Sequence, residues 1–204
     1  MKFTGDQRLM FGDPPVCRSD AVRWKVLRIK PNLDYRARCL SRKLIWSAVH
    51  YYRGRSVPCV GDGCKICVEL TSRWYAFIPV AFVKNGRLQG QSIMEVPAGA
   101  ALNLSGEIEK IVENGEEPWL GMQFIARRAN KSMRSPVVCE VDSLGNPVVE
   151  VDRLEVMASL CRMWGLPIID EATDEDTWKE IVTQRLDSDE HYARGKTTSR
   201  HFPD

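Results

Sequence analysis

The sequence predicts a mainly β protein with added helices (α+β), and three observations lead to this class. Arg73–Val83 is a run of aromatic and β-branched residues, Asn85-Gly86 follows it as a hairpin turn, and Gln91–Val96 returns as a second strand. Segments with helical periodicity come later, so strands and helices do not alternate as in a doubly wound sheet. About five strands joined by long loops fit a small antiparallel β-barrel of the OB type.

The other elements follow from local composition and from turn and capping residues. Further strands are expected within Ala21–Tyr52, where Cys39–His50 has the composition of one long half-exposed strand, and at Trp119–Arg128 and Val137–Val141. Helices are expected at Ser105–Asn114, from the capping box Asp152–Glu155 to Gly165, and at Asp174–Leu186.

A length of 204 residues fits one domain with appendages better than two large domains. Residues 1–20, rich in Gly, Pro and Asp, are expected to form a flexible arm, and residues 21–150 the OB-like core with a metal loop at 50–67. Residues 151–187 are expected to be a helical segment packed on this core, and residues 188–204 a disordered tail.

The charge is unevenly distributed along the chain. Residues 1–58 hold 13 Lys and Arg against 4 Asp and Glu, whereas the remaining residues hold 16 against 23, and the net charge is +2. Such a split is typical of a protein with a basic surface for polyanions and an acidic segment for another partner. The alternative is that the two halves neutralise one another across the folded surface.

Three of the seven cysteines lie within nine residues, in Cys59-Val-Gly-Asp-Gly-Cys64-Lys-Ile-Cys67. Glycines allow tight turns that bring thiolates together on one ion, and crowded cysteines in an intracellular chain favour a metal site over a disulfide framework. His50, at the end of an expected strand, supplies a fourth ligand. Because all four ligands come from the protein, the sequence predicts a structural Zn²⁺ at His50, Cys59, Cys64 and Cys67.

An iron–sulfur cluster is the main alternative to zinc. Cys-x4-Cys-x2-Cys is the spacing of plant-type [2Fe–2S] ferredoxins, whose fourth cysteine lies further along. The next cysteine here is Cys139, 72 residues after Cys67, and the basic surroundings are unlike an acidic electron carrier. Cys139 and Cys161 lie in apolar contexts and are expected to be core thiols.

Cations and aromatic residues gather around the cysteine loop in a pattern that suits single-stranded nucleic acid, because bases stack on rings while cations follow phosphates. If the segment Tyr35–Arg42 forms a strand, Arg36, Arg38 and Arg42 share one face of it. The arginines could equally form a solvated face, Trp46 could belong to the core, and Tyr75 and Phe77 could pack under a helix. The predicted contact residues are Arg36, Arg38, Arg42, Lys43, Trp46, Tyr51, Tyr52, Arg53, Arg55, Arg73, Tyr75, Phe77, Arg127, Arg128, Lys131 and Arg134.

A histidine upstream of Cys-x4-Cys-x2-Cys, set among basic and aromatic strands, resembles the zinc-containing single-stranded-DNA-binding protein of T-even bacteriophages. The resemblance covers residues 45–85 and is carried by His50, Cys59, Cys64 and Cys67. It implies an OB-fold with an inserted zinc subdomain, single-stranded DNA as partner, and recruitment of replication or recombination proteins by an acidic C-terminal segment.

The sequence lacks the motifs of common enzymes, including the Walker loop, Gly-x-Ser-x-Gly and His-Glu-x-x-His. We therefore expect a non-catalytic protein that binds single-stranded DNA, or RNA, in replication, recombination or repair, without a small-molecule substrate. With no apolar stretch of membrane-span length, we expect it in the cytoplasm of a bacterial or phage-infected cell, associated with the nucleoid. The alternative function is a zinc-stabilised interaction module, or an accessory subunit of a larger nucleoprotein assembly.

Overall fold

The computed structural model describes residues 24–52, 55–111, 119–143, 148–166, 180 and 183–184. Within this part, eight strands form one sheet, joined by a 3₁₀ turn and two α-helices of three turns or more. The predicted α+β class is confirmed. The strands are β1 (Val26–Arg28), β2 (Tyr35–Cys39), β3 (Ile45–Tyr52), β4 (Arg55–Pro58), β5 (Arg73–Lys84), β6 (Arg87–Pro97), β7 (Gln123–Arg128) and β8 (Val137–Ser143).

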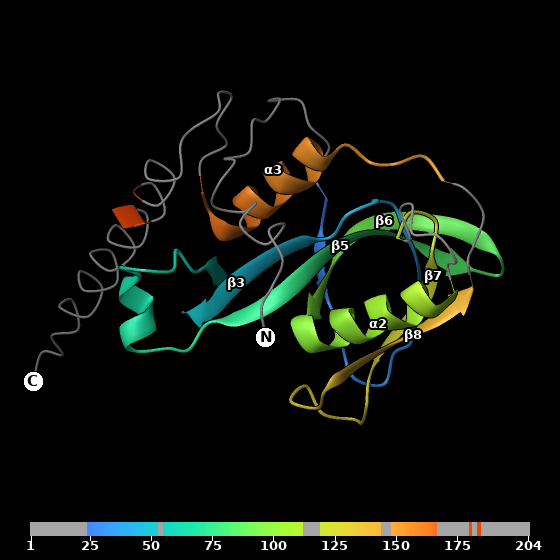
Figure 1. The fold of residues 1–204 in the computed structure, drawn as a ribbon, viewed down its shortest axis with the longest axis horizontal. Helices are drawn as coiled ribbons and strands as arrows, with labels where there is room; N and C mark the ends of the chain where they lie inside the picture. The colour runs from blue at the N-terminus through green and yellow to red at the C-terminus, as the bar shows by residue number, and fades with distance from the viewer. Residues whose placement is uncertain are drawn as a thin grey trace, which may run out of the picture.

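The sheet is ordered β1-β6-β5-β2-β7-β8, and β3 pairs with both β5 and β4. All pairs are antiparallel except β1 with β6. Strand β7 lies on one side of β2, and β5 followed by β6 lies on the other side of β2. This is the spatial order of a Greek key. The sheet is strongly curved but does not close into a barrel, because no pairing joins β8 to β6 among the described residues (Figure 1).

The expected single strand Cys39–His50 is divided into β2 and β3. The two strands pair with different halves of β5: β2 with Val80–Phe82, and β3 with Arg73–Phe77. Pro79 lies between these halves and has no N–H to donate, while its carbonyl accepts the Leu40 N–H at 2.9 Å. The prediction of one continuous strand was therefore wrong, and Arg42 lies in a bend outside β2.

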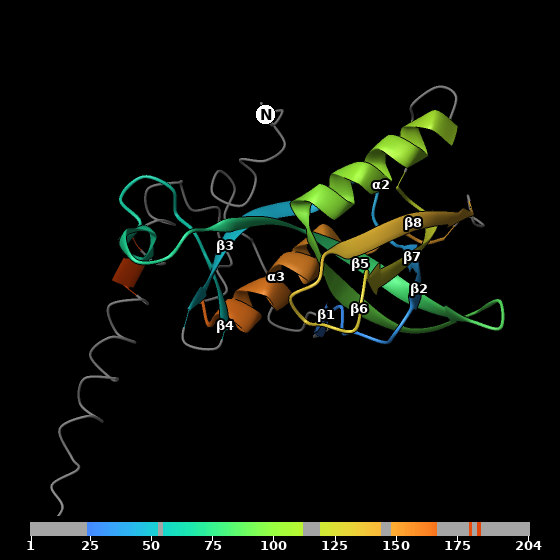
Figure 2. The same ribbon diagram turned by 90° about the horizontal axis from the view of Figure 1, so that it is seen from below.

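Two helices cover opposite faces of the sheet, α2 (Ala98–Ile111) and α3 (Arg153–Trp164). Figure 1 shows α3 on one side of the curved strands and α2 on the other, and the turned view in Figure 2 shows α2 running beside β8. Glu107 of α2 accepts the Val141 N–H of β8 at 3.2 Å. Helix α2 begins seven residues before the expected start, because Ala100, Ala101 and Leu104 extend its apolar stripe toward Pro97.

Helix α3 ends as the sequence predicts. Gly165 has a φ of 71°, and the Leu166 N–H donates to the Cys161 carbonyl at 2.9 Å, which is the bond pattern of a Schellman motif. The expected helix at 174–186 lies outside the described residues except for Glu180, Thr183 and Gln184, which are helical. The expected arm (1–20) and tail (188–204) also lie outside them.

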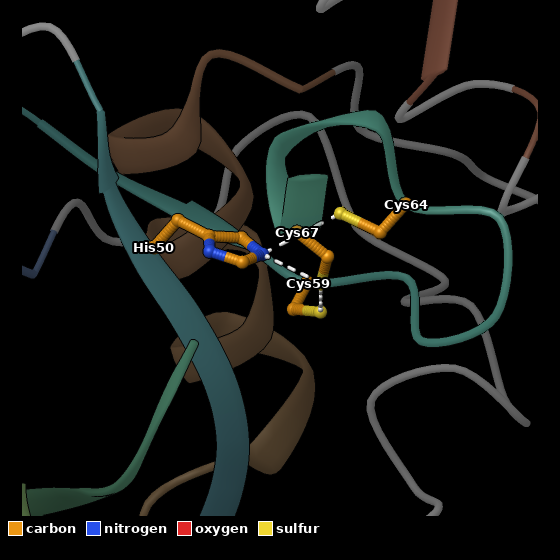
Figure 3. A group of neighbouring side chains, drawn as sticks. All are labelled: His50, Cys59, Cys64 and Cys67. Atoms are coloured by element: carbon orange, nitrogen blue, oxygen red, sulfur yellow. Dashed lines mark hydrogen bonds between the residues drawn. The ribbon is translucent and has the colours of Figure 1, made fainter. Parts of the chain in front are cut away.

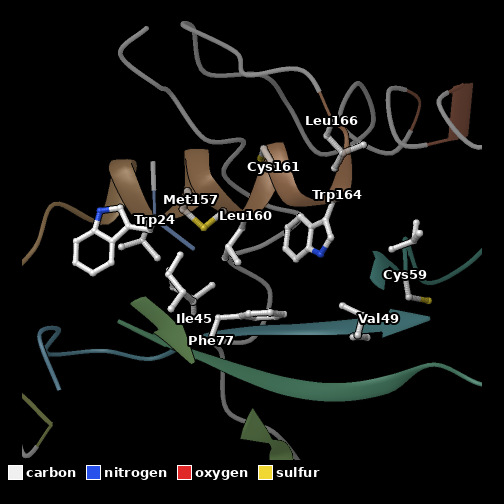
Figure 4. Packing of buried hydrophobic residues seen from close by; sticks show 14 of the residues in the cluster. Trp24, Ile45, Val49, Cys59, Phe77, Met157, Leu160, Cys161, Trp164 and Leu166 are labelled. Carbon is white, nitrogen blue, oxygen red and sulfur yellow. The ribbon is translucent and has the colours of Figure 1, made fainter. Parts of the chain in front are cut away.

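Two buried clusters lie on the two faces of the sheet. The α2 cluster contains Ile78, Val80 and Met94 with Leu104 and Ile108 of the helix. The α3 cluster contains Ile45, Val49 and Phe77 with Leu160 and Trp164 (Figure 4), and the Phe77 and Trp164 rings meet edge to face with centroids 5.7 Å apart. Strand β5 contributes to both clusters, because successive side chains point to opposite faces.

Phe77→Ala should lower the free energy of unfolding by about 3–5 kcal/mol, because it leaves a large cavity beneath Trp164. Leu33→Ala, at a side chain that is 51% exposed, is the control and should change it by less than about 0.5 kcal/mol. Urea denaturation followed by tryptophan fluorescence measures both. Equal effects of the two substitutions would contradict the position of Phe77 in the α3 cluster.

Candidate metal centre and charged surfaces

The β3–β4 hairpin positions the first two candidate metal ligands. His50 pairs with Val57 across the hairpin, and Cys59 follows the last residue of β4, Pro58. The Cys59 N–H donates to the Ala48 carbonyl at 2.8 Å, which extends the ladder by one bond. His50 and Cys59 are thus held by backbone hydrogen bonds on neighbouring strands.

A tight turn returns the chain so that Cys64 and Cys67 face the hairpin. Gly61 and Gly63 have φ values of 75° and 81°, a region that other residues rarely adopt. The Cys64 N–H donates to the Gly61 carbonyl and the Cys67 N–H to the Cys64 carbonyl, both at 3.1 Å. The second turn opens the 3₁₀ helix η2 (Lys65–Val68), which carries Cys67.

The ligand atoms of His50, Cys59, Cys64 and Cys67 all lie within 4.8 Å of one another (Figure 3). His50 Nε2 lies 3.4 Å from Cys64 Sγ and 3.5 Å from Cys67 Sγ, and Cys59 Sγ lies 3.5 Å from Cys67 Sγ. In a tetrahedral zinc site with Zn–S near 2.3 Å, ligand atoms are about 3.5–3.8 Å apart. The residues predicted as ligands therefore form a cluster that could hold a metal ion such as zinc.

The pKa shifts of three of these groups differ in direction, so they affect the binding of a cation differently. Burial lowers the pKa of His50, and this effect outweighs the backbone of Leu70 and Thr71, which raises the pKa. The imidazole is therefore neutral near pH 7, and its Nε2 can donate a lone pair to a metal ion. Desolvation and the Cys59 and Cys64 sulfurs raise the pKa of Cys67 to about 12. Burial also opposes ionisation of Cys64, but hydrogen bonds from the backbone and from Cys67 outweigh it and lower its pKa.

The metal loop is attached to the α3 cluster. Cys59, Val60, Cys64 and Ile66 are buried and belong to this cluster, which also includes Trp164. Figure 4 shows Cys59 beyond Val49 at the end of the cluster nearest the C-terminus of α3. A metal ion would thus fix the turn that closes this end of the core, as expected for a structural site.

The remaining described cysteines are too separate to complete a four-cysteine site. Cys39 and Cys139 lie in the α2 cluster, on the other face of the sheet, and Cys161 lies in α3. Burial raises the pKa of Cys39 and of Cys139 to about 12, so both stay protonated. Among the described residues, the fourth partner of the cysteine loop is His50, which does not match the plant-type [2Fe–2S] ligand set.

Three of the predicted phosphate-binding arginines form ion pairs on the surface. Arg36 lies 3.4 Å from Asp142, Arg42 2.7 Å from Glu150 and Arg127 2.6 Å from Glu140, measured between nitrogen and oxygen. Exposed pairs of this kind contribute about 0–1 kcal/mol and can exchange partners, but they reduce the local positive charge. Arg38 Nη2 donates to Gln123 Oε1 at 3.2 Å, and Arg128 donates to the Ile29 and Ser135 carbonyls.

The predicted aromatic platforms divide into buried and exposed rings. Phe77 is fully buried beneath α3, so it is not available to a base, in line with the alternative that it packs under a helix. Trp46 packs partly on the α2 cluster, and Tyr52 and Tyr75 partly on the α3 cluster. Tyr51 is 62% exposed.

The other predicted contact residues are mostly exposed cations. Lys43, Arg73, Lys131 and Arg134 are exposed, the last two in the loop between β7 and β8. The side chain of Arg55, at the start of β4, and the whole of Arg53 lie outside the described residues.

Sequence reasoning missed a polar cluster around Arg28. Its guanidinium pairs with the buried Glu95 at 3.0 Å, donates to Ser56 Oγ at 2.7 Å and lies 5.0 Å from the centroid of the Tyr51 ring. The contacts join residues from β1, β3, β4 and β6, so spacing along the chain gives no signal for them. The cluster fixes one face of the Tyr51 ring and leaves the ring itself exposed.

Comparison with protein families, with curated proteins and with solved structures finds no match to this chain. The described residues include no helix with the length and apolar character that a membrane crossing requires.

Cys64→Ala should abolish stoichiometric zinc binding, because three remaining ligands leave the tetrahedron incomplete. Cys139→Ala, at an equally buried thiol on the other face of the sheet, is the matched control and should retain zinc. Elemental analysis measures the metal, and a chelator should lower the melting temperature of the wild type and of Cys139→Ala but not of Cys64→Ala. Zinc retained by Cys64→Ala would contradict the assigned ligand set.

Zinc affinity should rise with pH. The pKa of Cys67 is raised to about 12, so its proton must leave when the metal binds, whereas the lowered pKa of His50 leaves no proton to displace near pH 7. Each displaced proton contributes about a tenfold gain in apparent affinity per pH unit. Competition with a chromophoric chelator at about pH 6 and about pH 8 tests this; an unchanged affinity would contradict coordination by these thiolates.

Proposed function

We propose that the chain is a non-catalytic protein that binds single-stranded nucleic acid, with single-stranded DNA as the first candidate, on an OB-like fold stabilised by one structural zinc ion. Its place would be in replication, recombination or repair. The metal centre supports the structural half of this proposal. The nucleic-acid half rests on the connectivity of the sheet and on the charge of two loops.

The connectivity is the observation that carries the proposal. An OB-fold is a five-stranded, partly open Greek-key barrel. With β2 and β3 taken as the two halves of a bent first strand, β5, β6, β7 and β8 follow as the second to fifth strands in Greek-key order. Helix α2 lies between the third and fourth of them. The pairing that would close the barrel is missing among the residues that the structure describes.

The loops that bind oligonucleotides in OB-folds follow the first and the fourth strand. Here the loop after the first strand contains the metal centre, with the exposed Tyr51 at its start and the exposed Arg73 at its end. The loop after the fourth strand, residues 129–136, carries Lys131 and Arg134 and no acidic residue. Cations and an exposed ring thus lie where this class of fold contacts single strands.

The resemblance to the T-even phage protein is carried by the four metal ligands and is consistent with this proposal. It would make the acidic segment that begins near residue 168 a contact for replication or recombination proteins, and it would place the protein in the cytoplasm, on the nucleoid. That segment lies outside the described residues except for Glu180, Thr183 and Gln184.

A second candidate function is a zinc-stabilised interaction module or accessory subunit. Two observations favour it: the pairing of Arg36, Arg42 and Arg127 with carboxylates, and the exposed apolar side chains of Val68 and Leu70 on the metal loop. Under this alternative the isolated chain would bind nucleic acid weakly and co-purify with a protein partner.

The purified zinc-loaded chain should bind a labelled single-stranded oligonucleotide with an affinity that falls steeply with salt and depends little on base sequence. The reason is that phosphate contacts release counterions, while stacking tolerates any base. Fluorescence anisotropy over a salt series, with DNA and RNA strands of equal length, measures this. Duplex DNA is the control and should bind more weakly; no binding at low salt, or preference for duplex, would contradict the proposal.

A further inference from the structure

An open groove of about 620 Å³ lies at the end of the sheet away from the metal centre. It is formed by the distal half of the β5–β6 hairpin, by the end of β2 and by residues 148–149 before α3. Its lining includes Arg38, Gln89 and Gln91 together with Leu88 and Val149. In Figures 1 and 2 the hairpin projects from the opposite end of the sheet to the metal loop. The volume is within the range of about 300–1,000 Å³ that is typical of ligand sites.

A β-bulge in the hairpin builds one wall of the groove. Gln89 pairs with Phe82 and Gln91 with Ala81, so Gly90 is an extra residue, and its φ is 51°. Bulges of this kind bend a strand and redirect its side chains. Here the bulge brings both glutamines to the same groove. A Cβ on Gly90 would meet no atom within 4 Å, so the backbone is open to a ligand at this point.

Apart from Arg38, the cations of this region are not among the contact residues that the sequence predicts. Lys84 and Arg87 flank the hairpin turn, are exposed, and form no ion pair with any described residue. Arg38 Nε is buried and has no hydrogen-bond partner among the described residues. Among the described residues, no carboxylate lines the groove. Lys84 and Arg87 lie outside the lining, further along the same hairpin, and their charge is available to an anionic ligand, unlike that of Arg36, Arg42 and Arg127.

The lining matches the chemistry of a nucleotide unit. Leu88 is 48% exposed and Val149 89% exposed, and together they offer apolar surface to a flat ring. The amide groups of Gln89 and Gln91 can both donate and accept hydrogen bonds, as base edges do. Arg87 precedes Leu88 in the sequence, and Lys84 pairs with Arg87 across the hairpin, so both cations lie close to the groove, where they could contact the phosphates of a bound strand.

We propose that this groove, which we call the hairpin groove, is a binding subsite for single-stranded nucleic acid, with a base between Leu88 and Val149 and phosphates on Lys84 and Arg87. The proposal rests on the proposed function for its ligand, single-stranded nucleic acid, but takes the hairpin groove as the contact surface in place of the loop that contains the metal centre. It predicts that zinc affects nucleic-acid binding only by stabilising the fold, and that the bound nucleic-acid strand contacts residues outside the cysteine loop.

Val149→Asp and Val68→Asp form a matched pair for the test, because their side chains are 89% and 88% exposed, one in the hairpin groove and the other on the metal loop. Anisotropy with a labelled oligothymidylate strand should show affinity about tenfold or more lower for Val149→Asp, since a carboxylate would face the anionic strand. Val68→Asp should bind as the wild type does. Circular dichroism and zinc content check that both variants remain folded.

Neutral substitutions give a second readout. Lys84→Ala combined with Arg87→Ala should make the slope of log affinity against log salt less steep by about 1.4, because two phosphate contacts are lost. Lys30→Ala combined with Lys110→Ala removes the same charge from exposed positions elsewhere and should leave the slope unchanged.

The outcomes separate the two proposals. If Val68→Asp weakens binding and Val149→Asp does not, or if both weaken it equally, the hairpin groove is not the subsite, although the proposed function stands. Equal slopes for the two lysine-containing pairs of substitutions overturn the inference in the same way. If the wild type does not bind the strand at low salt, the proposed function and the inference fail together.

Discussion

The structure depends on one long strand, β5, which pairs with β6 from Tyr75 to Lys84 and with β2 and β3 on its other side. Its side chains contribute to both buried clusters, so α2 and α3 are coupled through it. Pro79 lies between the part of β5 that pairs with β3 and the part that pairs with β2. The same strand continues into the hairpin that carries Lys84 and Arg87. The metal centre follows β3 and β4 at one end of the sheet, and the hairpin groove lies at the other end (Figure 1).

The two ends of β5 meet different physical requirements. At the metal end, three thiols lie close to a neutral imidazole; the thiolates would repel one another when ionised, and a bound cation would relieve this repulsion. At the hairpin end, cations lie apart from carboxylates, and an anion is the natural complement. Between them, the Arg28 cluster joins β1, β3, β4 and β6 by an ion pair and hydrogen bonds. In the proposed arrangement, a metal ion at one end stabilises the fold and the partner binds at the other end.

The sequence was sufficient to predict features that depend on local spacing. The metal ligands could be found because cysteines among glycines converge within one turn, and the β5–β6 hairpin because Asn85 and Gly86 both adopt positive φ. The break between β2 and β3 could not be found, since it depends on where Pro79 of another strand falls. Likewise, strand alternation placed Phe77 on an outer face, but a helix 76 residues later covers that face. The ion pairs of Arg36, Arg42 and Arg127 link distant segments and leave no pattern in the sequence.

The contact between Glu107 and the Val141 N–H has a consequence for self-association. A sheet that does not close has edges, and unpaired backbone groups at an edge can recruit a strand from another molecule. The Glu107 carboxylate accepts a hydrogen bond from one such donor on β8, the Val141 N–H, and charged side chains flank it at Glu140 and Asp142, which pair with Arg127 and Arg36. Two further edge strands are short: β1 has three residues, and β4, which pairs only with β3 among the described residues, has four. Short edge strands and an occupied donor on β8 both limit the pairing of this open sheet with a second molecule.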